Sequence, residues 1–171
     1  MRKSFQTLIL LSLFILAGSS ALQAFQIEST TLIFVRHAEK ASDGTRNPPL
    51  DEKGEKRASN LYKSLSDFDI KAVFSTPYKR TEMTAKPTAD SLDLEINTYG
   101  FENIEQFLEN IIVEYRGGAV LIVGHSNTTP ALVNMVLGSK EYEQIDESQY
   151  GDMFIVTTKE LGNATVDLKS F

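Results

Sequence analysis

The chain has 171 residues, of which 42% are hydrophobic and 23% charged, a profile typical of one soluble globular domain rather than of a disordered chain. Its formal net charge of −6 argues against nucleic acid or an anionic membrane surface as a partner. The chain has no cysteine, which excludes disulfide bonds, a thiol nucleophile and any cysteine-containing metal site.

The first 24 residues have the layout of a secretory signal peptide. Two basic residues form a positive start, an apolar run covers 8–17, and small residues follow as far as Ala24. The apolar run is short for a membrane span, which needs about 20 residues. We therefore expect cleavage after Ala24 or Ala21, export to the periplasm or the medium, and no stable membrane association of the mature domain, 25–171. The alternative is an uncleaved N-terminal anchor.

The mature domain begins with a predicted strand over 31–37, where a β-branched apolar run ends in an Arg-His pair. The next segment, 41–49, is polar and rich in Gly and Pro, so a loop is predicted there. A helix is predicted over 51–68 because its apolar residues recur on one face. A second, short strand is predicted over 72–75.

The middle of the chain continues the alternation of helix and strand. A helix is predicted over 79–91, and Pro87 should kink or divide it because proline has no N–H for the helical ladder. A third strand is predicted over 94–99. The clearest helical spacing covers 104–115, and a Gly-Gly pair ends it.

The last part of the chain begins with its most apolar strand, 119–124, which we expect near the centre of the sheet. A helix is predicted over 128–137, ending at Gly138. Two strands, 153–159 and 164–171, flank a Gly-Asn turn and predict a hairpin at the edge of the sheet.

Strands that alternate with helices predict an α/β fold in which helices cover both faces of the sheet. We expect a three-layer α/β/α domain over 25–171, with a mostly parallel central sheet and a C-terminal edge hairpin. No internal repeat or linker divides it.

The only two histidines of the chain, His37 and His125, each follow a predicted strand. Arg36 ends the first strand, and Arg80 begins the segment after the second. The carboxyl ends of parallel strands meet at one edge of a sheet, where ligands bind. Guanidinium groups match phosphate oxygens, and imidazole suits nucleophilic and proton-transfer chemistry.

Two further groups are expected beside the histidines. Ser126 and Asn127 stand at the predicted start of the last helix, where backbone N–H groups favour an anion. The sequence thus predicts a site for a phosphoryl group. It has no glycine-rich loop of the kind that binds nucleotide phosphates.

Four sequence blocks, each near the end of a predicted strand or the start of a helix, make the site more specific. In order and spacing they resemble the motifs of the histidine phosphatase superfamily, also called the phosphoglycerate mutase-like family. Ala38 stands where that family commonly has Gly. The blocks are Arg36-His37-Ala38-Glu39, Pro49-Leu50-Asp51-Glu52-Lys53-Gly54, 75–85 and Gly124-His125-Ser126.

The resemblance implies a phosphoglycerate mutase-like fold and a phosphomonoesterase that uses neither a metal nor another cofactor. His37 would be the nucleophile and would become a phosphohistidine, with its other ring nitrogen donating to a backbone carbonyl. The phosphoryl oxygens would be bound by Arg36, Arg80, His125, Ser126 and Asn127.

A leaving alkoxide needs a proton, and family members often supply it from a carboxylic acid after the third strand. Glu102 is the first candidate here and Glu105 the second. The alternative is that neither acts and that the substrate has a good leaving group. Glu39 is expected to orient Arg36 rather than to serve as the acid.

Hydrolysis is favoured over the other reactions of such a site. The loops after the first and third strands are brief, which predicts an open pocket, whereas a mutase must protect its phosphoenzyme from water. A non-catalytic phosphate-binding protein is the alternative from another class. The expected partner is a small phosphorylated substrate, for example a phosphorylated cell-envelope saccharide, or a phosphorylated protein side chain, and the sequence does not choose between these two.

Overall fold

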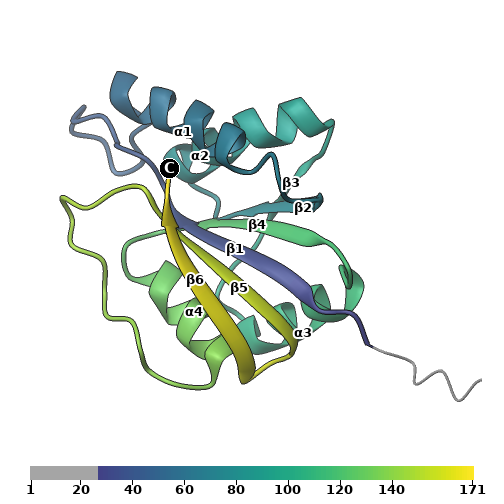
Figure 1. Cartoon of the computed structure of the whole chain (residues 1–171). Helices are drawn as coiled ribbons and strands as arrows, with labels where there is room; N and C mark the ends of the chain where they lie inside the picture. Colours follow the sequence, from purple (N-terminus) through teal and green to yellow (C-terminus); the bar gives the residue numbers. More distant parts are fainter. Residues whose placement is uncertain (1–26) are drawn as a thin grey trace, which may run out of the picture.

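The computed structural model describes residues 27–171, and the predicted signal segment with both of its cleavage positions lies outside that range. A six-stranded sheet runs through the domain in the order β3-β2-β4-β1-β5-β6 (Figure 1). The strands are β1 (Thr30–Arg36), β2 (Ile70–Ser75), β3 (Ile96–Thr98), β4 (Ala119–Gly124), β5 (Asp152–Glu160) and β6 (Asn163–Ser170). The helices are α1 (Glu52–Ser64), α2 (Lys79–Leu92), α3 (Ile104–Glu114) and α4 (Thr128–Leu137).

The first four strands are parallel to one another, and the C-terminal hairpin adds the antiparallel pairs. β4 pairs with both β1 and β2, and β2 pairs with β3, in parallel. β5 is antiparallel to β1, and β6 is antiparallel to β5 at the sheet edge. The predicted mixed α/β sheet with its edge hairpin is confirmed, and so is the internal position of the fully buried β4.

Helices cover both faces of the sheet, as Figure 1 shows: α1 and α2 lie on one face, α3 and α4 on the other. The side chains of β1 alternate between the two layers because successive residues of a strand point to opposite faces. Ile33 and Val35 belong to the cluster that includes Leu61 of α1. Leu32 and Phe34 belong to the cluster on the side of α3 and α4. Both faces of β1 are therefore buried, which explains its unbroken apolar run.

Two elements are shorter than their apolar patterns predict. Helix α1 ends at Ser64, although Leu65 and Phe68 continue the spacing and pack in the core from a turn. Strand β3 has only three residues, because Asp93 adopts a left-handed conformation at the end of α2 and the Leu94 N–H still bonds to the Ala89 carbonyl. Local capping has shortened both elements.

Pro87 does not divide α2, which was one of the two effects predicted for it. One helix runs from Lys79 to Leu92 with Pro87 inside it. Proline costs a helix one backbone hydrogen bond. Ala85 and Ala89, on either side of Pro87, are almost fully buried against the sheet. We attribute the continuity of α2 to this packing.

None of the helices in the described part of the chain combines the length and the hydropathy needed to span a bilayer.

Candidate active site

The carboxyl ends of three adjacent strands bring the two histidines together. His37 follows β1 and His125 follows β4, and the His37 N–H donates to the Gly124 carbonyl at 2.9 Å. The ring centroids of His37 and His125 lie 5.4 Å apart, with an angle of 70° between the ring planes. Thr76, directly after β2, completes this edge from the other side of β4. The parallel register therefore places both rings at one site.

His37 is held as a neutral imidazole with one free ring nitrogen. Its Nδ1 lies 2.7 Å from the Ala38 carbonyl, which can only accept, so Nδ1 carries the proton. Burial lowers the pKa of His37 from 6.5 to about 3, and the nearby Arg80 and His125 act in the same direction. Nε2 thus keeps an unshared electron pair near neutral pH, the form that a nucleophile requires.

The loop that carries His37 is fixed by two of the sequence blocks. The Ala38 N–H donates to Thr84 Oγ1 at 3.0 Å, and that hydroxyl donates to the Arg80 carbonyl at 2.7 Å. A Cβ atom at Gly54 would collide with the backbone of Glu39, so glycine lets α1 approach this loop closely. Asp51 caps the same helix by accepting from the Gly54 N–H at 2.8 Å.

His125 is oriented by a chain of hydroxyl groups. Arg80 Nη2 can only donate, so Nδ1 of His125 accepts from it at 3.3 Å and Nε2 carries the proton. Nε2 donates to Thr76 Oγ1 at 2.9 Å, and Thr76 donates to Thr81 Oγ1 at 3.0 Å. The Thr81 hydroxyl ends the chain at the Thr76 and Tyr78 carbonyls, at 2.8 Å each. Burial, and then Arg80, lowers the pKa of His125 to about 4.

Arg80 lies beside both rings with unused hydrogen-bonding capacity. Its guanidinium carbon lies 4.7 Å above the centroid of the Tyr78 ring, and Nη2 reaches His125. In the described part of the chain, Arg80 Nε and Arg36 Nε are buried donors without a hydrogen-bond partner. Unpaired buried donors are uncommon in folded proteins. Each of these two arginines therefore has one N–H that is not bonded to another described residue.

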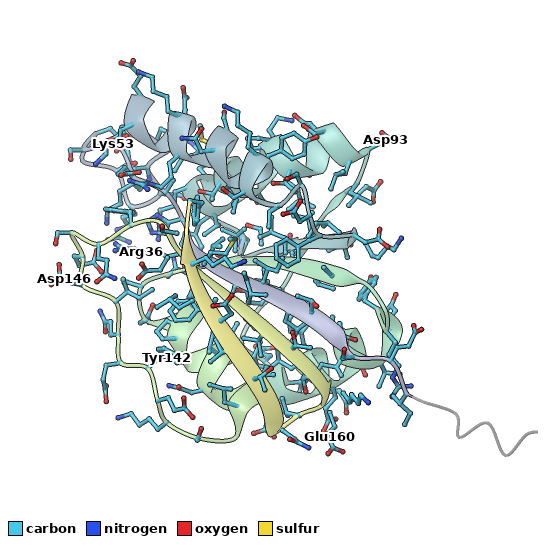
Figure 2. The ribbon with its side chains drawn as sticks, in the orientation of Figure 1. Arg36, Lys53, Asp93, Tyr142, Asp146 and Glu160 are labelled. Carbon is cyan, nitrogen blue, oxygen red and sulfur yellow. The ribbon has the colours of Figure 1, made fainter. Side chains whose placement is uncertain are left out.

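Arg36 uses most of its hydrogen-bond donors on protein groups, which its motif does not predict. The side chain is 2% exposed and is not among those that line the cavity described below. Nη1 donates to the Asp146 and Gln149 carbonyls at 2.8 and 2.7 Å, and Nη2 donates to Glu147 Oε2 at 3.0 Å. Figure 2 labels Arg36 and Asp146 where the loop after α4 passes the end of β1. Arg36 thus anchors this loop, and Nε is its free donor.

A cavity of about 700 Å³ opens at this edge of the sheet. Ser126 and Asn127 line it directly before α4, as predicted from their position in the sequence. The polar part of the wall is formed by His37, Lys40, Thr76, Arg80, His125, Ser126, Asn127, Thr128 and Glu147. Tyr78, Tyr99 and Phe101 form an aromatic side, with Pro77 next to it. The site therefore combines two cations, Lys40 and Arg80, with neutral polar groups and one carboxylate, and has aromatic groups beside them.

Glu147 is a site residue that the sequence analysis missed. It is the carboxylate that lines the cavity within the described part of the chain. Its Oε1 accepts from Ser126 Oγ at 2.7 Å, and Oε2 accepts from Arg36. The Ser126 hydrogen bond, followed by the charges of Arg36 and Lys40, lowers the pKa of Glu147. No motif surrounds Glu147. It lies 21 residues after Ser126 in the sequence, and only the folded loop places the two side chains in contact.

Glu102 and Glu105 are exposed, and neither lines the cavity, although Phe101 does.

Glu39 does not orient Arg36, so that prediction is wrong. Its carboxylate accepts two hydrogen bonds from Arg57 at 2.8 Å each, and it pairs with Lys53 at 3.1 Å. Arg57 reaches Glu39 because α1 packs on the loop after β1, a tertiary contact that local sequence does not reveal.

Residues 27–171 contain no cluster of three or more His, Asp or Glu side chains arranged to hold a metal ion. The groups that can neutralise an anion here are side-chain cations and hydrogen-bond donors.

Two sequence comparisons each match part of the chain. The family model of the histidine phosphatase superfamily (branch 1) matches residues 32–99. Phosphoserine phosphatase 1 of Hydrogenobacter thermophilus is 38% identical over 71 residues, which are 38% of this chain and 34% of that protein. The match thus spans about a third of the length of this curated relative.

Solved structures resemble the whole domain. The protein histidine phosphatase SixA complexed with tungstate has a TM-score of 0.67 at 20% identity, over 82% of this chain and 96% of that one. Phosphoserine phosphatase from Entamoeba histolytica with 3-phosphoglyceric acid has a TM-score of 0.64 at 16% identity, covering 83% and 98%. A mycobacterial glucosyl-3-phosphoglycerate phosphatase has a TM-score of 0.67 at 12% identity, covering 83% and 99%. These likenesses establish a shared fold.

Proposed function

We propose that this chain, whose residues 32–99 match the family model, is a member of the histidine phosphatase superfamily (branch 1) and hydrolyses phosphate monoesters or phosphoramidates without a metal, through a phosphohistidine at His37. One observation carries the proposal. His37 is neutral with a free Nε2, its ring lies 5.4 Å from that of His125, and Arg80 beside them holds an unpaired buried N–H. A nucleophile and unused anion donors thus share one cavity.

Substrate binding would begin with a change of partner for Arg80. Its Nη2 transfers a hydrogen bond from His125 to a phosphoryl oxygen, and its Nε supplies a second one. Ser126 and the Nε of Arg36 are the next donors, provided that the Glu147 carboxylate moves aside. Positioned cations stabilise the charge that spreads over the phosphoryl oxygens in the transition state.

The reaction would take place in two steps. Nε2 of His37 attacks phosphorus, the P–O or P–N bond to the leaving group breaks, and the electron pair departs with the leaving oxygen or nitrogen, which takes a proton from water to become the alcohol, phenol or amine. Water then attacks the phosphohistidine, the P–N bond breaks, and Nε2 recovers its electron pair. The hydrogen bond from Nδ1 to the Ala38 carbonyl keeps the same nitrogen available in each cycle.

We propose Glu147 as the group that accepts a proton from the attacking water. It lines the cavity, and its lowered pKa keeps the carboxylate ionised, the form that can accept a proton but cannot donate one. Glu102, the first acid candidate from the sequence, would have to move from an exposed position to reach the leaving group.

The substrate class and the location are proposed on separate grounds. A small phosphorylated molecule or a phosphorylated protein side chain fits the open cavity, and the related proteins named above are phosphatases for phosphoserine, protein phosphohistidine and a phosphorylated glucoside. Export rests on the signal-like pattern of residues 1–24. N-terminal sequencing of protein from the periplasm or the medium would test it, and a chain that keeps Met1 in the cytoplasm would contradict it.

The decisive test is phosphate release from an aryl phosphate, whose good leaving group needs little acid catalysis. The purified protein should turn it over and should carry an acid-labile, base-stable phosphoryl group after rapid quenching. His37→Ala should abolish both signals with the far-UV circular dichroism unchanged. Folded wild-type protein that binds phosphate without turnover would instead identify a phosphate-binding protein. A phosphoenzyme that transfers its group to an alcohol faster than to water would identify a mutase.

A further inference from the structure

The cavity that contains both histidines continues onto a wall of aromatic side chains. Tyr78 is 41% exposed and Phe101 is 49% exposed, and both line the cavity together with the buried Tyr99. Large apolar side chains that lie singly on a surface need no explanation. These two converge on one cavity from separate segments, one after β2 and the other before α3. We call Tyr78, Tyr99 and Phe101 the aromatic wall.

The aromatic wall is held in place from behind. Tyr99 is 4% exposed, stacks on Phe107 of α3 with centroids 5.2 Å apart, and donates its hydroxyl to the Val123 carbonyl at 3.3 Å. Phe101 packs edge-on against Tyr99, with centroids 6.2 Å apart. The exposed ring is therefore supported by the core, and little side-chain freedom is lost when a ligand contacts it.

The same wall adjoins the groups that would bind the phosphoryl oxygens. The Tyr78 ring meets His125 at a centroid distance of 5.0 Å with perpendicular planes, and Arg80 lies over its face. A substrate anchored through its phosphoryl group at these residues must project its organic part into the remaining cavity. The aromatic wall is a side of that space.

We propose that the aromatic wall is the subsite for a flat aromatic group bonded through oxygen or nitrogen to the phosphoryl group, a proposal that rests on the proposed phosphatase function. Rings favour edge-to-face or offset contact with other rings, which an alkyl chain or a sugar does not reproduce. The substrate class is therefore an aryl phosphate or a phosphorylated aromatic side chain.

The carboxylates of the site agree with this assignment. Glu102 and Glu105 do not line the cavity, and the pKa of Glu147 is lowered, so no carboxylic acid of the described residues is placed to protonate a leaving alkoxide. A phenol has a pKa of about 10, so its oxygen leaves without a proton far more readily than an alkoxide does. The P–O bond breaks, the phenoxide carries away the electron pair, and it takes its proton from water.

Phosphonates test the subsite without turnover, because their P–C bond survives. The full-length protein should bind phenylphosphonate about tenfold more tightly than methylphosphonate in calorimetry. Phe101→Ala should remove about three- to tenfold of the phenylphosphonate affinity, the range that one aromatic pair contributes, and should leave methylphosphonate unchanged. Phe101→Leu keeps an apolar side chain without a ring and should lose most of the same preference. Tyr62→Ala, which removes an exposed aromatic side chain of α1 outside the cavity, should change neither affinity.

The outcomes separate the two proposals. Failure of both phosphonates and inorganic phosphate to bind would overturn the proposed function itself. Binding of methylphosphonate with no preference for the phenyl compound, or an equal loss for both in Phe101→Ala, would overturn the aromatic subsite alone. Cyclohexylphosphonate bound as tightly as phenylphosphonate would also overturn it, because that ring is not flat. A phosphotyrosine peptide compared with phenyl phosphate as substrate distinguishes a protein side chain from a free aryl ester.

Discussion

Arg36 and Glu147 form an ion pair across 111 residues of sequence, with Nη2 and Oε2 3.0 Å apart. The arginine is 2% exposed and the glutamate 64%, so the guanidinium is fixed while the carboxylate can turn towards solvent. The second carboxylate oxygen, Oε1, accepts a hydrogen bond from the Ser126 hydroxyl. The carboxylate of Glu147 thus uses two of the donors predicted for a phosphoryl group.

Glu147→Gln should therefore tighten the binding of inorganic phosphate. The neutral amide removes a negative charge from the anion site, and for so exposed a group we expect about 0.5–1 kcal/mol, or about two- to fivefold. Turnover should fall if Glu147 also accepts the proton of the attacking water. Competitive inhibition by phosphate gives the first value and steady-state kinetics the second. Glu143→Gln, on the same loop but paired with Lys140, is the matched control. Weaker phosphate binding in Glu147→Gln would show that the carboxylate does not compete.

Arg80→Ala should weaken phosphate or vanadate binding by about 1.5–3 kcal/mol, the range for a lost hydrogen bond to a charged group. Arg80 has an unpaired Nε and a second donor that His125 can release. Inhibition constants measured on wild type and variant provide the comparison. Arg116→Ala removes an arginine that does not line the active-site cavity and should have no effect. Equal affinity in Arg80→Ala would remove this residue from the anion site.

Binding of a phosphate dianion should raise the pKa of His125. In the empty cavity burial and the neighbouring Arg80, Arg36 and Lys40 lower it to about 4. The dianion opposes these positive charges, so the ring takes up a proton on Nδ1 and donates it to the ligand. The complex then binds more protons than the free protein, and affinity should increase as pH falls through the higher pKa. NMR titration of the imidazole C–H signals with and without methylphosphonate measures the shift. An unchanged pKa would contradict the predicted contact.

The folded protein should lose stability as pH falls from 6.5 towards about 3 because of its histidines. The pKa values of His37 and His125 are lowered to about 3 and about 4, so the unfolded chain takes up protons in this range that the folded chain does not. Each unit of difference is worth roughly 1.4 kcal/mol. Urea unfolding at pH 7 and pH 5 should show a lower free energy of unfolding at pH 5. The drop should be smaller in His37→Gln and in His125→Gln, and an equal drop in wild type and both variants would refute the assignment.

Glu39→Gln should lower the free energy of unfolding by about 1–3 kcal/mol, because it removes a two-point ion pair with Arg57 at a largely buried carboxylate. The pKa of Glu39 is lowered to about 2, chiefly by Arg57, so its contribution is present above about pH 4.5 and is lost as pH falls towards 2. This window overlaps the lower end of the histidine window and extends below it. Glu52→Gln, which breaks an exposed pair with Lys56, is the control and should change stability little. Equal destabilisation by both variants would contradict the prediction.

The sequence predicts the fold well because the strongest signals here are local. The β-branched runs that become β1 and β4 end in Arg36-His37 and Gly124-His125, and the parallel connection puts both ends at one edge. Helices α3 and α4 follow their apolar spacing almost to the residue. The division of α2 at Pro87 does not occur, because burial of the residues around it outweighs the local penalty.

The site is predictable only as far as its residues follow regular elements. His37, Arg80 and His125 do so, and they come together as their positions imply. Glu147 does not, because it lies on the irregular connection between α4 and β5, and nothing in its neighbourhood points to Ser126 or Arg36. Long-range packing likewise sets the partners of Arg36 and Glu39. The prediction that Glu39 orients Arg36 relied on their closeness in sequence and was wrong for this reason.

The hydroxyl chain behind His125 has a fixed direction, because it ends on carbonyl oxygens that have no hydrogen to give back. The hydroxyl groups of Thr76 and Thr81 both donate away from the His125 ring. If the ring flipped, its unprotonated nitrogen would face the Thr76 oxygen, and both of these atoms would be acceptors. Folding therefore fixes Nδ1 of His125 as the ring nitrogen without a proton before any ligand binds. Ligand binding then loses no free energy in orienting this ring.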